Sequence, residues 1–285
     1  MGKSVGKKNY RGTGGGSLSR EAGEGRGGGS VLPSALERLE EIERRLDGRR
    51  PAVFLDYDGT LSPIAPRPEM ATLPEETREV VRRLAQRYPV GILSGRGRED
   101  VTSLVGLDGL SYAGSHGYDI AGPGIRHEVG EGIPARIDSA AEALRQELEE
   151  IEGVLIEPKR FAISIHFRLA GEEDLPLIER VVDEVATSHP GLRKAHGRKL
   201  FELRPNLDWD KGQALLWMMD ALNLFAEVPL YLGDDITDED AFRVVEKQGI
   251  GILVAEEPRP TAAAYGLRDP SEVLRFLEWL ADLPR

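Results

Sequence analysis

Two short apolar segments with one helix-like segment between them constrain the fold of this chain more than any other feature. Residues 52–57 (AVFLDY) and 90–93 (VGIL) read as strands, and apolar residues recur at helical spacing between positions 80 and 88. Thr72 and Glu75 have the spacing of a capping box ahead of that helix. A strand, a helix and a strand in this order form a βαβ unit, so we expect parallel strands joined by a right-handed crossover.

A similar alternation of helices and strands returns near the C-terminus. It comprises expected helices over residues 211–222 and 238–247, expected strands over 229–232 and 251–255, and a last helix capped by Asp269 and Pro270. A further helix is expected over residues 32–46, ended by Gly48, before the first strand. These elements predict an α/β fold, a doubly wound parallel sheet.

The middle of the chain has a different pattern. Helical spacing over residues 135–151 and 174–188 alternates with two expected hairpins, over 154–168 and 192–204. This α-β-β-α-β-β order predicts a small α+β domain inserted into the parallel one. The expected division is therefore a core formed by residues 31–132 and 206–285, with an inserted cap over residues 133–205.

Composition excludes several classes of protein. Acidic residues outnumber basic ones 49 to 37, which argues against nucleic acid as the main partner. The absence of cysteine excludes disulfides, thiolate catalysis and cysteine-ligated zinc. The longest apolar region is interrupted by polar residues, so no membrane span is expected. Residues 1–30 are basic and rich in Gly and Ser, without the apolar core of a signal peptide, so we expect a disordered tail and a cytoplasmic location.

Asp56 and Asp58 end the first expected strand and are followed by Gly59. Taken alone, Asp58-Gly59 is as typical of a hairpin turn as of a site, because both residues tolerate positive φ. A parallel sheet places a helical connection after Gly59, which disfavours the hairpin. Two carboxylates so close together repel each other, and this favours a bound cation or a shared proton.

Other polar residues stand at corresponding places along the chain. Ser94 and Arg96 follow the second expected strand, Asp234 follows a late strand, and Lys211 opens a helix. Each has an ordinary explanation as a turn residue, a surface cation or a helix-terminal acid. Ligands of open parallel sheets bind beyond the carboxyl ends of the strands, however, so we expect these residues to share one edge of the sheet.

The sequence then resembles a known family. DYDGT, LSGR, DKG and LGDDITDEDAF resemble the four successive motifs of the haloacid dehalogenase-like phosphatases. More narrowly, FLDYDGTLSPI, ILSGR, GSHG, IHFR, FELRP and GDDITDEDAF resemble the trehalose-6-phosphate phosphatases, over roughly residues 50–280. One departure is Phe167, which stands where that family leads us to expect a tyrosine before the final arginine of EPKRFAISIHFR.

The resemblance implies catalytic roles. Asp56 would attack phosphorus and form an aspartyl-phosphate, and Asp58 would protonate the leaving oxygen and then deprotonate water. Ser94 and Lys211 would hold the phosphate oxygens.

The absence of cysteine and the oxygen-rich site predict Mg²⁺ as cofactor, and the resemblance implies its ligands. The ligands would be Asp56, the backbone carbonyl of Asp58, and Asp234, with Asp235 and Asp238 in the surrounding shell. An acidic helix N-terminus would explain the late acids without a metal.

Substrate choice would depend on the inserted domain, which can close over the site. The resemblance favours Lys159 and Glu202 from this domain, and His116 and Gly117 from the core, with Arg96 as a contact to phosphate or cap. A polar sheet face turned to solvent would equally explain the first two. His127, His189 and His196 have no ligand spacing and are expected at the surface.

The leading hypothesis is a Mg²⁺-dependent phosphatase that converts trehalose 6-phosphate to trehalose and phosphate. Its partner would be a small sugar phosphate, with a functional link to a trehalose-6-phosphate synthase and no nucleic acid or membrane. One alternative is a related phosphatase acting on sucrose phosphate, a mannosyl-glycerate phosphate or a hexose phosphate. The other is a non-catalytic sugar-phosphate sensor.

Overall fold

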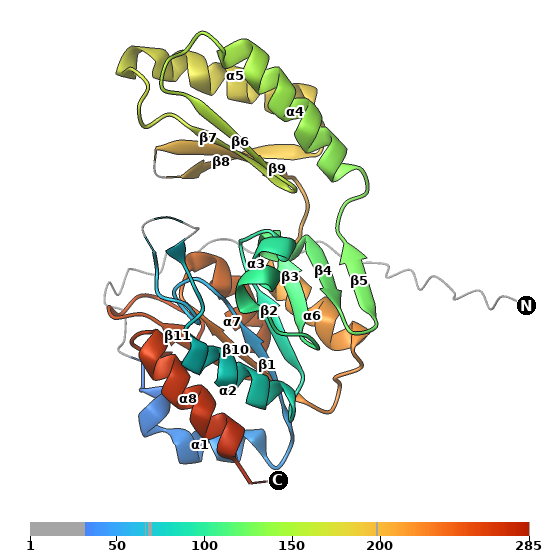
Figure 1. Cartoon of the computed structure of the whole chain (residues 1–285), viewed down its shortest axis with the longest axis vertical. Coiled ribbons are helices and arrows are strands. Elements are labelled where there is room, and N and C mark those ends of the chain that lie inside the picture. Colours follow the sequence, from blue (N-terminus) through green and yellow to red (C-terminus); the bar gives the residue numbers. More distant parts are fainter. Residues whose placement is uncertain (1–31, 66, 68–69, 198, 285) are drawn as a thin grey trace, which may run out of the picture.

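The central strand of the larger sheet, β1 (Pro51–Leu55), is buried along its whole length in the computed structural model (Figure 1). Val53 and Leu55 pack into one hydrophobic cluster, and Ala52 and Phe54 pack into another on the opposite face. Because both faces are covered, the strand is a continuous apolar run without alternation.

The structure describes residues 32–284, with the exception of residues 66, 68–69 and 198. The Gly/Ser-rich tail expected over residues 1–30 lies outside the described residues. Within the described part of the chain, no helix combines the length and the apolar character needed to cross a membrane.

The larger sheet confirms the expected α/β fold. Among the described residues it has eight strands in the order β12-β11-β10-β1-β2-β3-β4-β5. The other strands are β2 (Val90–Leu93), β3 (Ser111–Gly114), β4 (Asp119–Gly122), β5 (Ile125–Glu128), β10 (Val228–Gly233), β11 (Ile250–Val254) and β12 (Tyr265–Leu267). Pairing is parallel from β12 to β3, whereas β4 and β5 add an antiparallel edge that the expected all-parallel sheet lacked.

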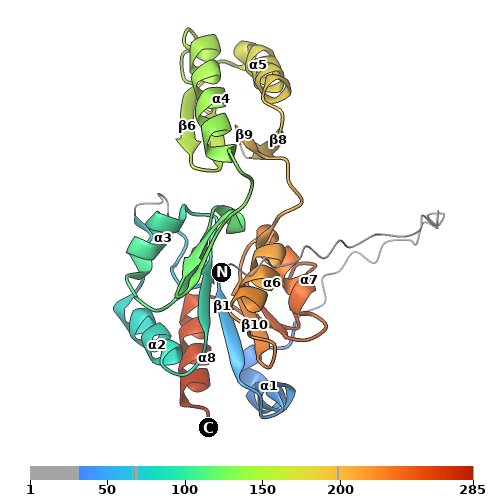
Figure 2. The ribbon, with the colours of Figure 1, turned by 90° about the vertical axis from the view of Figure 1, so that its right-hand side faces the viewer.

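Helices cover both faces of this sheet (Figure 2). One face carries α2 (Glu75–Ala85), α3 (Arg98–Val105) and α8 (Pro270–Asp282), and the other carries α6 (Lys211–Ala221) and α7 (Glu239–Val245). The first α-helix, α1 (Leu39–Leu46), packs Ile42 and Leu46 into the same cluster as α8.

The expected starts of the first two α-helices were wrong, and so was the expected capping residue of each. The first α-helix starts only at Leu39, after a 3₁₀ turn, and Asp47 in the left-handed conformation ends it, one residue before Gly48. Pro74, and not Thr72, precedes α2, so the expected capping box does not form. The carbonyl of Thr72 instead accepts a hydrogen bond from the hydroxyl of Ser62. At α8 the expected cap is confirmed, because the Asp269 side chain accepts from two backbone N–H groups.

A second, smaller sheet confirms the inserted α+β unit. Within the residues described, its four strands follow the order β6-β7-β9-β8, and every pairing is antiparallel. Its elements are α4 (Ile133–Leu148), β6 (Leu155–Lys159), β7 (Ala162–His166), α5 (Leu175–Ser188), β8 (Leu192–Gly197) and β9 (Leu200–Pro205). The helices α4 and α5 cover the far face of this sheet, and its other face is turned toward the larger sheet (Figure 1).

Candidate active site

The carboxyl ends of three neighbouring parallel strands meet at one edge of the larger sheet. Asp56 follows β1, Ser94 follows β2 and Asp234 follows β10. Lys211 is the first residue of α6, which Asp210 caps by accepting from a backbone N–H. The structure therefore brings together the residues that the strand-end argument selected.

Lys211 links two of the carboxylates. Its side chain is only 2% exposed, and its ammonium lies 3.0 Å from Oδ1 of Asp56 and 2.7 Å from Oδ1 of Asp238. Asp238 also accepts hydrogen bonds from the Tyr231 hydroxyl and, at 2.8 Å, from the backbone N–H of Asp235. These donors occupy both oxygens of Asp238 and hold it in place against Lys211.

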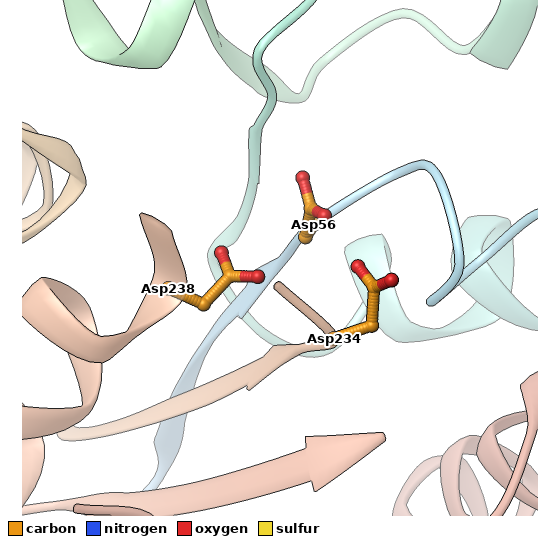
Figure 3. A group of neighbouring side chains, drawn as sticks. All are labelled: Asp56, Asp234 and Asp238. Carbon is orange, nitrogen blue, oxygen red and sulfur yellow. The ribbon is translucent and has the colours of Figure 1, made fainter. Parts of the chain in front are cut away.

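Asp56, Asp234 and Asp238 form a compact oxygen cluster, as Figure 3 shows. One carboxylate oxygen from each lies within 4.8 Å of the others. Gly59 makes this approach possible, because a Cβ at that position would lie 2.1 Å from Oδ2 of Asp234. Its φ of +74° also favours glycine.

The cluster carries more negative than positive charge. Burial raises the pKa of Asp56 well above its usual value, Lys211 opposes this, and Asp238 and Asp234 add to it. Burial and then the charge of Asp238 raise the pKa of Asp234 to about 6. Burial disfavours the charge on Lys211, but Asp56 and Asp238 outweigh that effect and raise its pKa.

A divalent cation would relieve this repulsion, since it favours the ionised form of each acid that it touches. The donors available in the cluster are carboxylate oxygens. Hard oxygen ligands in small number, with room for water and phosphate, suit Mg²⁺. The residues of the cluster therefore fit the metal that the sequence predicted.

Asp58 has a different environment from Asp56. It is 42% exposed and forms two hydrogen bonds with the Arg96 guanidinium, at 2.7 and 2.8 Å. Arg96 also contacts Asp100 and lies over the ring of Tyr57. The Arg96 guanidinium thus pairs with Asp58, the second acid of the DYDGT motif, and does not line the cleft described next.

A cleft of about 360 Å³ separates the smaller sheet from the Lys211 end of the site. Three residues expected to bind sugar line it, namely Lys159, Glu202 and His116. The polar face of the smaller sheet is therefore turned toward the site, and the Lys159 side chain on it is 50% exposed. Gly117 is not part of the lining, and its carbonyl accepts a hydrogen bond from the Trp209 indole at 2.9 Å. The clustered carboxylates do not line this cleft, but Lys211, which contacts two of them, does. Lys211 does not line the two larger hollows elsewhere on the surface.

Several cleft residues lie outside the set that the sequence favoured, namely Tyr118, Arg193, Arg204 and Arg243. Arg193 and Arg204 are directly opposite each other on β8 and β9. Like charges at such positions are unfavourable without an anion or polar ligand nearby, which is a signal that alternation along the hairpin could have given.

Histidine environments also differ from expectation. Nδ1 of His116 is buried and, in the part of the chain that the structure describes, has no hydrogen-bond partner. Burial, Lys211 and Arg204 lower the pKa of His116 to about 4, so the ring is neutral. His127 is half-buried and stacks on Trp217 with a centroid separation of 4.6 Å, which corrects its expected surface position.

Comparisons with known proteins agree with this geometry. A family model for trehalose-phosphatase matches residues 54–271. Probable trehalose-phosphate phosphatase D of Arabidopsis thaliana is 42% identical over 268 residues, which cover 88% of this chain and 72% of that protein. Trehalose-phosphate phosphatase B of the same plant is 42% identical over 270 residues, covering 89% and 72%.

A solved structure is similar in fold as well. Trehalose-6-phosphate phosphatase of Aspergillus fumigatus, in its crystal form 3, matches with a TM-score of 0.65 and 25% identity over 88% of this chain and 99% of that one. The family model and both plant relatives span most of the described residues, including the strand-end motifs and the inserted unit. The chain therefore belongs to the trehalose-phosphatase family, phosphoric monoester hydrolases built on the haloacid dehalogenase-like fold.

Proposed function

We propose that this protein hydrolyses trehalose 6-phosphate to trehalose and phosphate, with Mg²⁺ as cofactor and an aspartyl-phosphate intermediate. The observation that carries the proposal is the buried contact of Lys211 with Asp56 and Asp238 at one end of a cleft whose other wall holds Lys159 and Glu202. The names of the plant relatives support the choice of substrate.

In the first step, a carboxylate oxygen of Asp56 forms a bond to phosphorus. The bond from phosphorus to the sugar oxygen breaks, and its electron pair stays on that oxygen, which takes a proton from Asp58. The Lys211 ammonium lies next to Asp56 and stabilises the charge that builds up on the phosphoryl oxygens. The hydroxyl of Ser94, at the end of the neighbouring strand, donates a hydrogen bond to a phosphoryl oxygen.

In the second step, water attacks the phosphorus of the aspartyl-phosphate. Asp58, now ionised, takes a proton from that water, and the bond between phosphorus and Asp56 breaks. Phosphate leaves and the Asp56 carboxylate is restored. Because Arg96 holds both oxygens of Asp58, this pair has to open before Asp58 reaches the leaving group.

Asp56, Asp234 and the backbone carbonyl of Asp58 would hold the magnesium ion. When bound, the ion neutralises negative charge at the phosphoryl group and lets Asp56 stay ionised. Asp238 supports the site indirectly, because its oxygens already orient Lys211 and the backbone N–H of Asp235. Asp235 belongs to the same surrounding shell.

The inserted unit would act as a cap that selects the sugar. We assign residues 133–205 to the cap and residues 31–132 and 206–285 to the phosphatase core. Lys159 and Glu202 on the cap and His116 on the core offer donors and acceptors to sugar hydroxyls, and their shared cleft supports this role. A cytoplasmic location and a link to a trehalose-6-phosphate synthase complete the proposal, since such an enzyme supplies the substrate.

Phosphate release from a panel of sugar phosphates tests the proposal. With Mg²⁺ present, the wild type should prefer trehalose 6-phosphate to sucrose 6-phosphate and glucose 6-phosphate. Asp56→Asn keeps the shape of the nucleophile but removes its charge, and should lower turnover by more than about 10³-fold. Asp220→Asn, the same change on the exposed side of α6, should leave turnover intact.

Two results would contradict the proposal. Equal rates across the panel would reject the substrate, and full turnover by Asp56→Asn would reject the nucleophile.

A further inference from the structure

At the tip of the hairpin between β6 and β7, two successive residues contact the larger domain directly after Lys159. Lys159 lines the cleft. Arg160 reaches carboxylates of the larger domain, and Phe161 stacks on Tyr118, with ring centroids 5.9 Å apart and an interplanar angle of 18°. Lys159, proposed above to bind the sugar, is thus followed directly by two residues that connect the cap to the core.

The contacts of Arg160 are polar and specific. Its Nη2 lies 2.6 Å from Oε2 of Glu128, and its Nε lies 3.9 Å from Oδ2 of Asp119. Glu128 ends β5 and Asp119 begins β4, and the two residues are directly opposite in that antiparallel pair. Two acids in such positions repel each other, so cations at this place stabilise the strand pair.

The core supplies two of those cations by itself. Asp119, whose side chain is 4% exposed, accepts from Nε of Arg98 at 3.0 Å and lies 2.8 Å from Nη1 of Arg126. Arg126 also lies 3.8 Å from Glu128. When Arg160 leaves, both acids keep a positively charged partner, so no buried charge is stranded. The Arg160 contact can therefore break and re-form at low cost.

We propose that Arg160 is a positioning residue for the reaction proposed above: its ion pair with Glu128 fixes the hairpin tip on the core and so holds Lys159 across the cleft from His116. Asp119 is at the start of β4, two residues beyond Gly117 in the loop that carries His116. The Arg160 contact therefore sets the position of Lys159 on the cap relative to His116 on the core. The side chains of Arg160 and Glu128 are 50% and 32% exposed, so salt screens their attraction.

Kinetics on the full-length chain test the effect on substrate. At low ionic strength, Arg160→Gln and Glu128→Gln should each raise KM for trehalose 6-phosphate about two- to five-fold, with a smaller change in kcat. At about 1 M ionic strength, where the Debye length is about 3 Å, KM of wild type and variants should converge. The charge-swapped pair Arg160→Glu with Glu128→Arg should lie closer to wild type than either single reversal.

Controls separate positioning from chemistry. Turnover of p-nitrophenyl phosphate, a small ester that does not reach the cap, should be unchanged in Arg160→Gln. Arg180→Gln removes an arginine of similar charge and exposure that pairs with Glu184 inside α5, and should leave KM unchanged. Wild-type KM for Arg160→Gln at low salt, or a charge swap no better than the single reversals, would overturn the proposal.

A distance measurement gives a readout that does not need catalysis. The chain has no cysteine, so Glu147→Cys on α4 and Glu278→Cys on α8 provide unique sites for a fluorophore pair. Arg160→Gln should broaden the cap-to-core distance distribution, and Arg180→Gln should not. An unchanged distribution in Arg160→Gln would overturn the proposal. A chain inactive on every sugar phosphate would reject the proposed function, while this measurement still decides the role of Arg160.

Discussion

At the scale of single residues, His116 combines backbone conformation, burial and charge. Its φ is +57°, and burial together with Lys211 and Arg204 lowers the pKa of the ring to about 4. The unfolded chain binds the proton with the ordinary histidine pKa of about 6.5. Protonation of His116 therefore favours unfolding. The stability that depends on a neutral His116 ring is fully present above about pH 6.5 and is lost as the pH falls toward 4.

Replacing His116 by asparagine tests this sign. Asparagine tolerates positive φ and does not titrate here. Between pH 7 and pH 4, the free energy of unfolding of the wild type should fall by about 1–3 kcal/mol more than that of His116→Asn, as measured by urea unfolding at each pH. His196→Asn, at an exposed position, should retain the wild-type pH dependence. Parallel curves for wild type and His116→Asn would show that the ring does not carry the effect.

Residue-level prediction from sequence succeeded where the backbone decides the outcome. Asp56, Ser94 and Asp234 directly follow parallel strands, and the ends of such strands must meet. It did not anticipate the pairing of Arg96 with Asp58, because side-chain direction in a loop depends on neighbours that only the tertiary structure supplies. Arg193 was missed although alternation along its hairpin offered a signal, because its pairing with Arg204 also depends on the register of the two strands.

At the scale of elements, α8 offers a clear test of a helix cap. Asp269 accepts hydrogen bonds from the backbone N–H groups of Ser271 and Glu272, at 2.8 and 3.1 Å. Asp269→Ala leaves these donors without that acceptor and should lower the free energy of unfolding by about 0.5–2 kcal/mol. Asp269→Asn caps about as well and should change it far less. Denaturant unfolding measures both, and equal losses in the two variants would contradict a role for the cap. Phosphatase activity should be unchanged, because α8 does not line the cleft.

The elements that sequence predicted best are those that packing determines. Continuous apolar runs such as β1, β2 and β10 must be buried on both faces, and their positions agree with expectation. The antiparallel strands β4 and β5 were missed because they are short and partly polar, although the Pro123-Gly124 turn between them is a hairpin signal. Thr72 does not cap α2, although its spacing to Glu75 matches a capping box. The helix starts after Pro74, two residues later than that motif predicts.

At the scale of the whole molecule, the inserted unit was predictable from the change of pattern, because an α-β-β-α-β-β order cannot continue a parallel sheet. Its orientation was not predictable. Which face of the smaller sheet turns toward the site depends on the two connections to the core, near residues 129–132 and 206–210, and on the contacts of Tyr118 with the cap. Alternation along β9 shows that Glu202 and Arg204 share a face, but not what that face meets.

Magnesium should couple the metal site to the stability of the whole chain. Asp56 and Asp234 come from strands far apart in sequence, so their oxygens converge only in the folded state. A ligand that binds only the folded state stabilises it, by about 2.7 kcal/mol at a concentration 100 times its Kd. We therefore expect magnesium chloride to raise the Tm of the wild type by roughly 5–10 °C.

The variant Asp234→Asn should lose most of this response. Burial and the charge of Asp238 raise the pKa of Asp234 to about 6, so an ionised Asp234 destabilises the folded state at pH 8. Without metal, Asp234→Asn should therefore be more stable than the wild type at this pH. With magnesium it should gain little, because a ligand is lost. Thermal unfolding with sodium chloride at matched ionic strength controls for general screening of the net charge of −12, and Asp220→Asn controls for the loss of one acid. An equal magnesium-induced rise in Tm for wild type and Asp234→Asn would place the ion elsewhere in the chain.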